Sequence, residues 1–547
     1  MGGLKARAAL ACGIAAAAAV LAVLLALAPV AGAQAPRNPV IFVHGYVGSG
    51  AQFESQKQRL VENGYPDDSV QVLEYDSTPA TPVPGVTGLN PAGVQVIEAQ
   101  LFPRLDQLIA QLKAQAGRPK VELIAHSLGT LLMQDYLKSD PARAANVADY
   151  VNVDGQTASS PPGGVRTLAL WATKGPLSPP GRSITGAKNV TIPDSTHVQS
   201  ATSPISFRAM YEFFTGSAPA TTDIRSQPGP ITLSGKALNF PNNTGLAGAT
   251  VQVWPVDDAT GQRTSPDPTA TYQLGSGGDW GPVSAQSGRR YEFTLLRPGV
   301  PVHHFYYEPF LRNDHLIRLL ESDALRSAGG PADSDSVAMV LIRYKELWGD
   351  QGAGSDVLTL DGVSACTAAV CPLSHLTNAL FAGDFDHDRQ SDTSKPNSTY
   401  YQLPFVSGVD VYMPAQTPAV GKVTVRLRSR GVGPVRTLTF PNFPGLTDVV
   451  TVQLNDFEQP VPVASTPAAC VPHPRLVLRL RQPRHGRIVR VQAYMDGRLI
   501  KRAQGHRVKR LTLRRPSRAD FRLVIVEWTA GGRRLQFVRH FRRCGRI

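Results

Sequence analysis

The chain has 547 residues, 42% hydrophobic and 18% charged, so it can bury a sizeable core and wholesale disorder is not expected. Its 49 Gly and 45 Pro argue against an all-helical or coiled-coil protein. The formal charge of +14 is uneven. Residues 470–547 contain 22 Lys and Arg against 3 Asp and Glu, which gives +19 there and −5 elsewhere. The basic character therefore belongs to one terminal segment.

Residues 1–33 have the pattern of a secretory signal peptide. Lys5 and Arg7 precede an apolar run over residues 8–30, and Ala31-Gly32-Ala33 is a small-residue cleavage site. The run is also long enough for a retained membrane anchor, which stays the alternative. We expect cleavage and a secreted or extracellular protein, with cell-surface association left open.

Four cysteines follow the expected signal peptide. An even number of cysteines in an exported chain favours disulfides, and we expect the pairs Cys366–Cys371 and Cys470–Cys544, although other pairings are formally open. A structural zinc site is disfavoured because C-x-x-C spacing and a matching histidine pair are missing from the sequence.

The first part of the chain, up to about residue 219, alternates between strand and helix patterns. Strands are expected at 39–44, 69–75, 121–125, 150–153, 168–173 and 189–192, and helices at 53–63, 92–116, 130–138 and 204–214. Such alternation predicts a mostly parallel sheet with helices on both faces.

The pattern after residue 219 is that of β structure. Short alternating segments such as Thr250–Val256 and Lys422–Arg430 are separated by Gly, Pro and Asp. In the last segment, strands such as Leu476–Arg481 and Phe521–Trp528 have a polar face of mostly arginine. The expected division is a signal peptide at 1–33, a catalytic domain at 34–219, β-rich domains at 220–330 and 331–465, and a basic β module at 470–547.

The segment Ala125-His126-Ser127-Leu128-Gly129 follows an apolar strand and opens a helix. This context is typical of a nucleophile elbow, in which a sharp turn exposes the serine hydroxyl beside the helix N-terminus. Gly129 is the small residue that the turn needs, and Ala125 replaces the usual first glycine. An ordinary polar turn is the alternative, and we predict Ser127 as nucleophile.

A serine nucleophile needs a base and an acid that orients it. His197 is the one histidine between Ser127 and the end of the α/β region. Asp154 follows a strand at its carboxyl edge, where catalytic groups gather, whereas Asp149 begins that strand. Asp194, close to the histidine loop, is the rival acid.

The end of the first strand, Val43-His44-Gly45-Tyr46, supplies an electrophilic element. We expect the backbone N–H groups of Tyr46 and Leu128 to form an oxyanion hole. His44 is expected to pack the loop rather than to take part in catalysis.

The runs Ile41–Gln56, Asn63–Pro66 and Glu74–Asp76 resemble exported prokaryotic lipases of the α/β-hydrolase superfamily. The particular subset is the archaeal-type lipases with a β-rich, lipid-binding C-terminal part. The likeness continues at Thr196–Gln199, Ala220–Ile224, His303–Phe310, Glu346–Gly352, Ser407–Pro414 and Val452–Phe457. It covers about residues 38–460 and leaves out the arginine-rich tail.

The resemblance implies an α/β-hydrolase fold followed by all-β domains. Carried over by position, its triad falls on Ser127, Asp154 and His197, and its oxyanion donors fall on Tyr46 and Leu128. The family's lid region departs from this pattern, because residues 77–93 are short and Pro-rich here.

The short lid segment weakens the expectation of interfacial activation. The β region could cover the acyl groove instead, with Phe305, Tyr306 and Tyr307 as candidates. The alternative is that these aromatics alternate between the core and the surface of a strand.

Asp384, Asp386, Asp388 and Asp392 are spaced like a calcium loop. Alternating carboxylates can converge on a hard cation, but the bidentate Glu of an EF-hand is missing from the sequence and no Gly follows Asp388. Calcium and a solvated acidic turn both stay open. The ester chemistry itself requires no metal or organic cofactor.

The sequence as a whole predicts a secreted carboxylic ester hydrolase, in first place a lipase acting at a lipid–water interface. A polyester depolymerase or acyltransferase with the same triad is the close alternative, and a lipid- or envelope-binding protein with an inactive hydrolase domain is the distant one. The basic tail predicts attraction to an anionic cell envelope or is merely basic. No nucleic acid or protein partner is expected.

Overall fold

The computed structural model describes residues 37–82, 88–323, 333–458, 475–480, 482–483, 486–495, 498–514, 521–542 and 545–546. The expected signal peptide and the expected Cys470–Cys544 pair lie outside these residues. The chain divides into two compact units, Met1–Gln459 and Pro460–Ile547. Among the described residues, no helix is both long and apolar enough to cross a membrane.

A six-stranded sheet forms the centre of the N-terminal region. Its strands are β1 (Val40–Val43), β2 (Val70–Leu73), β3 (Val121–His126), β4 (Val147–Val153), β5 (Arg166–Ala172) and β6 (Lys188–Ile192). They run parallel in the order β2-β1-β3-β4-β5-β6. All four residues of β1 are buried, because helices cover both faces of a parallel sheet.

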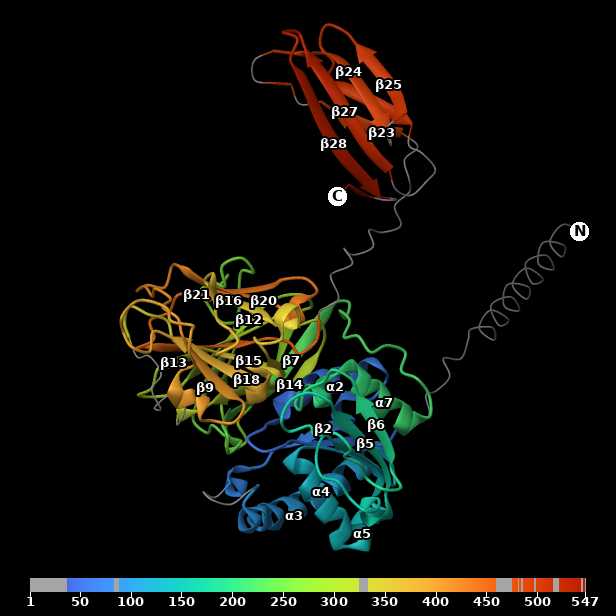
Figure 1. Ribbon diagram of the computed structural model, residues 1–547, viewed down its shortest axis with the longest axis vertical. Coiled ribbons are helices and arrows are strands. Elements are labelled where there is room, and N and C mark those ends of the chain that lie inside the picture. Colours follow the sequence, from blue (N-terminus) through green and yellow to red (C-terminus); the bar gives the residue numbers. More distant parts are fainter. Residues whose placement is uncertain are drawn as a thin grey trace, which may run out of the picture. The chain divides into compact units, whose positions relative to one another are not determined.

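Helices pack on both faces of this sheet (Figure 1). They are α2 (Glu54–Glu62), α3 (Pro91–Ala116), α4 (Leu128–Ser139), α5 (Pro141–Ala145), α6 (Gln199–Thr202) and α7 (Pro204–Thr215). Successive residues of β1 point to opposite faces, so that Ile41 packs with α3 and α4, and Phe42 with α7. The predicted α/β-hydrolase architecture is confirmed.

The longest helix, α3, forms where its sequence signals predict. The Asn90 side chain caps it by accepting the Ala92 N–H, and Gly117 ends it with a left-handed backbone. Between these ends, apolar residues such as Val94 and Leu101 recur at helical spacing and are buried against the sheet.

The rest of the first unit is β-rich. Its elements are β7 (Pro230–Asn239), β8 (Thr244–Gly245), β9 (Thr250–Pro255), β10 (Ala270–Gln273), β11 (Asp279–Gln286), β12 (Tyr291–Leu296), β13 (Val302–Tyr307), β14 (Asp314–Glu321), β15 (Met339–Leu347), β16 (Val357–Leu360), β17 (Val363–Ser364), β18 (Thr377–Gly383), α9 (Ser398–Tyr401), β19 (Val406–Asp410), β20 (Lys422–Arg428), β21 (Arg436–Pro441) and β22 (Asp448–Gln453).

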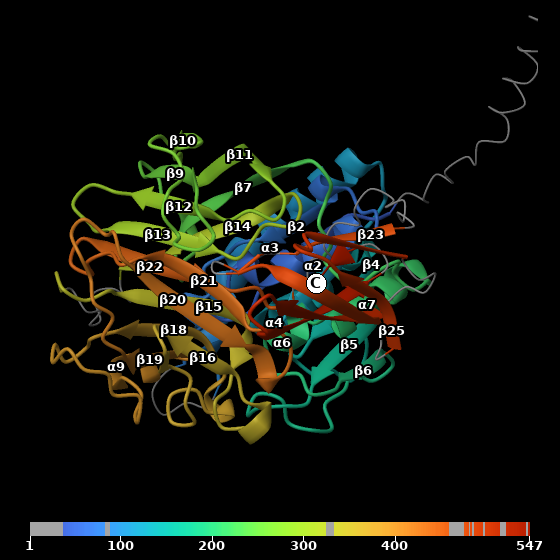
Figure 2. The same ribbon diagram turned by 90° about the horizontal axis from the view of Figure 1, so that it is seen from above.

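One eight-stranded sheet runs through this whole β region, in the order β10-β9-β12-β13-β22-β15-β18-β19 (Figure 2). The last strand, β22, lies parallel between β13 and β15. Smaller sheets, β11-β7-β14 and β17-β16-β20-β21, complete the region. Strands of the two expected domains, 220–330 and 331–465, therefore share one sheet, while the expected boundaries themselves stay a prediction.

Both faces of β13 are buried. Phe305 and Tyr307 pack in a core with β7, β11 and β14, whereas Tyr306 packs in the core on the other face with β20 and β21. These aromatics are thus core residues, and the hypothesis that they cover an acyl groove is wrong. The sequence could not exclude it, because strand alternation alone does not tell whether the second face is covered.

The expected Cys366–Cys371 disulfide is not formed in this structure. Both cysteines are free thiols buried in an apolar core cluster with residues such as Val370. Burial and the neighbouring Cys366 thiol hold the pKa of Cys371 well above its usual value. The two thiols therefore pack as small apolar side chains.

The second unit consists of β structure. Its strands are β23 (Arg475–Arg479), β24 (Ile488–Met495), β25 (Arg498–Gln504), β26 (Arg510–Arg514), β27 (Phe521–Thr529), β28 (Arg534–Arg542) and β29 (Gly545–Arg546). They form a β23–β26 pair and a sheet in the order β25-β24-β27-β28-β29. Ile488, Val491 and Leu523 belong to their common core, as expected for a basic β module.

Candidate active site

Ser127 occupies the turn between β3 and α4. Its backbone has φ 54° and ψ −123°, a strained combination for a residue with a side chain. The Ser127 N–H donates to the Val153 carbonyl oxygen at 3.1 Å, which ties the turn to β4. A strained serine between a strand and a helix is the geometry of a nucleophile elbow.

Two glycines let backbone segments meet at this turn. A Cβ atom on Gly45 would lie 2.7 Å from Ser127 Cβ, and one on Gly129 would lie 2.6 Å from the His44 carbonyl oxygen. The end of β1 therefore packs directly against the elbow. The N–H groups of Tyr46 and Leu128, the expected oxyanion donors, come from these two segments, and their role stays a prediction.

Asp154 and His197 lie next to each other at the carboxyl end of β4. His197 Nδ1 lies 2.7 Å from Asp154 Oδ2, and both side chains are buried. Asp154 follows β4 with a φ of 44°. The structure thus brings together the predicted base and the predicted acid.

Asp154 also accepts hydrogen bonds from the Ala172 N–H at 2.8 Å and the Ser178 hydroxyl at 2.9 Å, and it pairs with Arg182. Burial raises the pKa of this carboxyl, but the hydrogen bond from His197 and the charges of His197 and Arg182 outweigh burial and bring the pKa below its usual value. Asp154 is therefore ionised at neutral pH.

The other ring nitrogen, His197 Nε2, is buried and has no hydrogen-bond partner among the described residues. In a Ser-His-Asp triad this nitrogen takes the serine proton. No hydrogen bond joins it to Ser127 in the described part of the chain, so the three-residue assignment stays a prediction.

The rival carboxylates lie elsewhere. Asp194 has a side chain 87% exposed, 3.6 Å from Lys174. Asp149 pairs with Arg166 and neighbours the buried Glu122. Of the three carboxylates considered, Asp154 is the one that the structure brings to His197, and Asp149 lies at the start of β4, as expected.

Two further histidines lie close by, both buried and both held neutral. His44 stacks on Tyr75 with ring centroids 4.2 Å apart, and burial lowers its pKa, which fits the expected packing role. His126 lies against His197 with centroids 4.6 Å apart. Burial, together with the neighbouring His197, lowers the pKa of His126 to about 3. Gln52 Nε2 lies 3.1 Å from the His126 ring.

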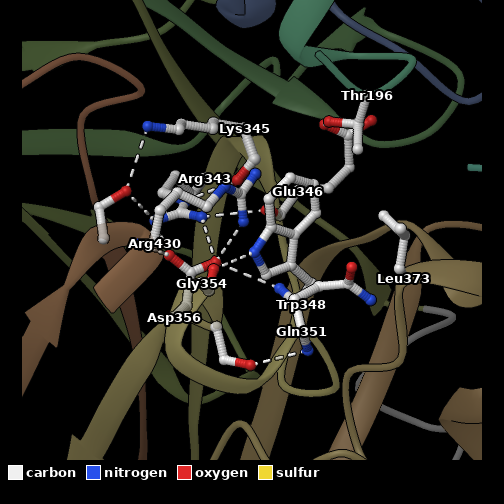
Figure 3. A network of polar contacts seen from close by, with 12 residues as sticks. Thr196, Arg343, Lys345, Glu346, Trp348, Gln351, Gly354, Asp356, Leu373 and Arg430 are labelled. Carbon is white, nitrogen blue, oxygen red and sulfur yellow. Dashed lines mark hydrogen bonds and ion pairs between the residues drawn. The ribbon is translucent and has the colours of Figure 1, made fainter. Parts of the chain in front are cut away.

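The β region holds the His197 loop through Glu346, at the end of β15 (Figure 3). The Glu346 carboxylate accepts the N–H groups of Val198 at 2.6 Å and Gln199 at 3.0 Å, and the Thr196 hydroxyl. Sequence reasoning missed this residue as a site element, although it begins one of the segments that carry the lipase resemblance. Its place beside His197 depends on tertiary packing.

A buried ion-pair network supports Glu346 (Figure 3). Arg343 pairs with Asp356 at 2.8 Å and donates to the Glu346 carbonyl oxygen at 3.0 Å. Arg430 also pairs with Asp356, lies 3.2 Å from the centroid of the Trp348 ring, and donates to the Gln199 side chain. Because its charges are paired and hydrogen-bonded, the network holds β15 in a fixed position next to the His197 loop.

An apolar cavity of about 420 Å³ adjoins the site. Its wall includes Tyr46, from the oxyanion segment, and Phe405, whose ring stacks on His197 with centroids 6.2 Å apart. Further lining residues such as Met339 and Phe381 come from β15 and β18. The cavity therefore lies between the catalytic domain and the β region, and it is of the size that ligand pockets usually have.

An acidic loop follows β18. Asp384, Asp386 and Asp388 converge, with one carboxylate oxygen of each within 4.8 Å of the others. Asp392 does not join them, because its carboxylate accepts from Ser394 and lies 3.4 Å from Lys395. The four-residue candidate set is thus corrected to three.

Comparisons with known proteins assign two parts of the chain to lipase families. Residues 37–150 match the family model of class 2 lipases, residues 229–324 match that of the lipase C-terminal domain, and residues 329–458 match one described as a C-terminal domain. The chain is that of a lipase or esterase with C-terminal β domains. At the coarser level, it is a hydrolase acting on esters.

Solved structures with similar chains are more distant. Aspergillus fumigatus lipase B is 14% identical with a TM-score of 0.26, over 36% of this chain and 56% of that one. Bacillus licheniformis lipase BlEst2 is 9% identical with a TM-score of 0.26, over 94% and 95% of the two chains. Scores this low carry no argument about function. No curated protein sequence matches the hydrolase.

Proposed function

We propose that this hydrolase is a secreted lipase that cleaves acylglycerol esters through Ser127, His197 and Asp154. The observation that carries the proposal is the combination of a strained Ser127 on the elbow with a buried His197–Asp154 pair, 2.7 Å apart. Nucleophile, base and orienting acid are the three roles that ester hydrolysis by a serine enzyme needs.

In the proposed reaction, Ser127 Oγ attacks the ester carbonyl carbon while His197 Nε2 takes its proton. The N–H groups of Tyr46 and Leu128 stabilise the oxyanion. The tetrahedral intermediate expels the alcohol, which takes the proton from His197, and an acyl-enzyme remains. Water then loses a proton to His197, attacks the acyl carbon and releases the carboxylic acid, while Ser127 recovers its proton. Asp154 stays ionised throughout and stabilises the imidazolium.

The apolar cavity supports a substrate with a long acyl chain. It shares Tyr46 with the proposed oxyanion site and Phe405 with the face of His197. A chain entering the cavity would leave water, which favours binding in proportion to the apolar area buried. A substrate with a short acyl group would leave most of this cavity empty.

Hydrolysis of p-nitrophenyl esters from C2 to C16, and of emulsified triglyceride, tests the proposal. We expect the rate to rise with chain length, and Ser127→Ala and Asp154→Asn to lower kcat by about 10³- to 10⁴-fold. Asp194→Asn is the matched control and should retain activity. Equal activity of wild type and Ser127→Ala would overturn the assignment of the nucleophile.

We further propose that the enzyme works outside the cell, where its basic second unit attracts it to anionic surfaces. The signal pattern of residues 1–33 and the +19 formal charge of residues 470–547 support this proposal. No bound cofactor is needed for the proposed ester chemistry.

A further inference from the structure

The loop after β18 brings together three aspartates that have no role in the proposed ester hydrolysis: Asp384, Asp386 and Asp388. Asp384 is buried at 1% exposure, whereas Asp386 and Asp388 are exposed. One carboxylate oxygen from each lies within 4.8 Å of the other two. Three like charges held this close repel each other unless a cation lies between them.

Asp384 has an oxygen without a partner. Its Oδ2 accepts the Arg389 N–H at 3.0 Å, but its Oδ1 is buried and has no hydrogen-bond partner among the described residues. A buried carboxylate oxygen left unpaired is costly. This oxygen without a partner therefore belongs to the buried aspartate of the cluster.

Within the described ranges, the basic side chains of this loop pair with carboxylates outside the cluster. Arg389, from the same loop, pairs with Asp335, and His387 pairs with Asp333. No lysine or arginine of these ranges forms an ion pair with Asp384, Asp386 or Asp388.

A fourth carboxylate adds to the charge. Asp410 ends β19 opposite Gly383, the residue before Asp384, and its Oδ1 accepts the Phe385 N–H at 3.0 Å. Burial and the charges of Asp386 and Asp384 raise the pKa of Asp410. The negative charges of Asp384 and Asp386 therefore act on the neighbouring Asp410 carboxyl.

We propose that this loop binds one Ca²⁺ ion through the carboxylates of Asp384, Asp386 and Asp388. Ca²⁺ takes six to eight oxygen ligands at about 2.3–2.6 Å, so two ligands of one ion lie up to about 5.2 Å apart, and the observed cluster fits. Two exposed ligands leave room for water in the remaining positions. Mg²⁺ fits less well, because it requires near-ideal octahedral geometry.

Calorimetry on the full-length protein, after dialysis against EDTA, tests the site by titration with CaCl₂. We expect binding of one ion, with a Kd on the order of 10⁻⁴ M as in extracellular modules, and a Tm about 2–4 °C higher in millimolar Ca²⁺. MgCl₂ should give a smaller shift. Binding and melting do not depend on activity, so they are independent of the proposed function.

The double variant Asp386→Asn/Asp388→Asn should lose both the binding heat and the Tm shift. Its two side chains are exposed, so the fold does not depend on them. Asp392→Asn is the control and should bind like wild type. The proposal is overturned by wild type without binding heat or Tm shift, or by a Tm shift that survives in the double variant.

Discussion

The Asp154 carboxylate accepts hydrogen bonds from four donors: His197, the Ala172 N–H, the Ser178 hydroxyl and the Arg182 guanidinium. Of the three besides His197, Arg182 carries a positive charge. Arg182 pairs with Asp154 from the loop between β5 and β6, and its guanidinium lies 4.9 Å from the centroid of the Trp171 ring. The charge of Arg182 stabilises the ionised form of the Asp154 carboxyl, which orients the base, and so lowers its pKa. We infer that Arg182 tunes the pH at which the site becomes active.

Arg182→Met should move the acid limb of the kcat/KM–pH profile to higher pH. The sign follows from charge. The Arg182 charge is one of the groups that lower the pKa of the Asp154 carboxyl, so without Arg182 the carboxylate that orients His197 takes up a proton at higher pH. The measurement is the pH dependence of short-ester hydrolysis.

Arg182→Lys retains the charge and should keep the profile close to wild type. If Arg182 only braced Asp154, the Met variant would lose kcat equally at every pH and its acid limb would stay in place. That result would contradict an electrostatic role.

The His197 loop is positioned by elements that lie on either side of it. From the catalytic domain, Gln56 on α2 donates to the Ala201 and Ser203 carbonyl oxygens, and Arg59 donates to the Thr202 carbonyl oxygen. From the β region, Glu346 on β15 accepts from the residues around His197. The β region therefore holds the loop that carries His197 and also forms part of the cavity wall.

Glu346→Gln should lower kcat for a short ester about 10- to 100-fold and leave KM nearly unchanged. All three groups that face this carboxylate are donors, and an amide can present only one accepting oxygen to them. Misplacing the base affects the transition state more than substrate binding. Steady-state kinetics on p-nitrophenyl acetate is the measurement.

Asp350→Asn is the matched control, since Asp350 accepts from the Leu373 N–H and, among the described residues, forms no hydrogen bond with the His197 loop. It should behave as wild type. Equal rises of KM and falls of kcat in both variants would show that Glu346 has no specific effect on the base.

The formal charge of the chain is positive in the C-terminal segment and negative in the rest. Residues 470–547 have a formal charge of +19 and the remainder has −5. The described arginines include Arg490, which covers the Trp528 ring at 4.0 Å. Two units of opposite charge predict that one of them governs binding to anionic surfaces.

A variant ending at Gln459 should lose binding to vesicles containing phosphatidylglycerol, whereas the full chain should bind them and be released by high salt. Hydrolysis of a short soluble ester should change less than twofold, since all predicted site residues lie in the first unit. Vesicle sedimentation at two ionic strengths is the measurement. Undiminished vesicle binding by the shortened chain would exclude this role of the tail.

Local signals determined much of this architecture. The helix and strand periods before residue 219 predicted the strands of the parallel sheet and its longer helices, because each of these elements carries its own apolar pattern. Ser127, Asp154 and His197 follow the ends of strands or lie in the loop before the last helices, so sequence order and the sheet edge were enough to select them. The choice between Asp154 and Asp194 was also made on this basis, and the contact with His197 agrees with it.

Tertiary packing decided the rest. Glu346 bonds the neighbours of His197, and Phe405 stacks on its ring, each across more than 140 residues of sequence. Asp410 comes next to the acidic loop through the pairing of β19 with β18. The insertion of β22 between β13 and β15 joins strands that the local pattern assigned to separate domains. Periodicity and spacing report only on neighbours along the chain, whereas these contacts depend on which faces pack together.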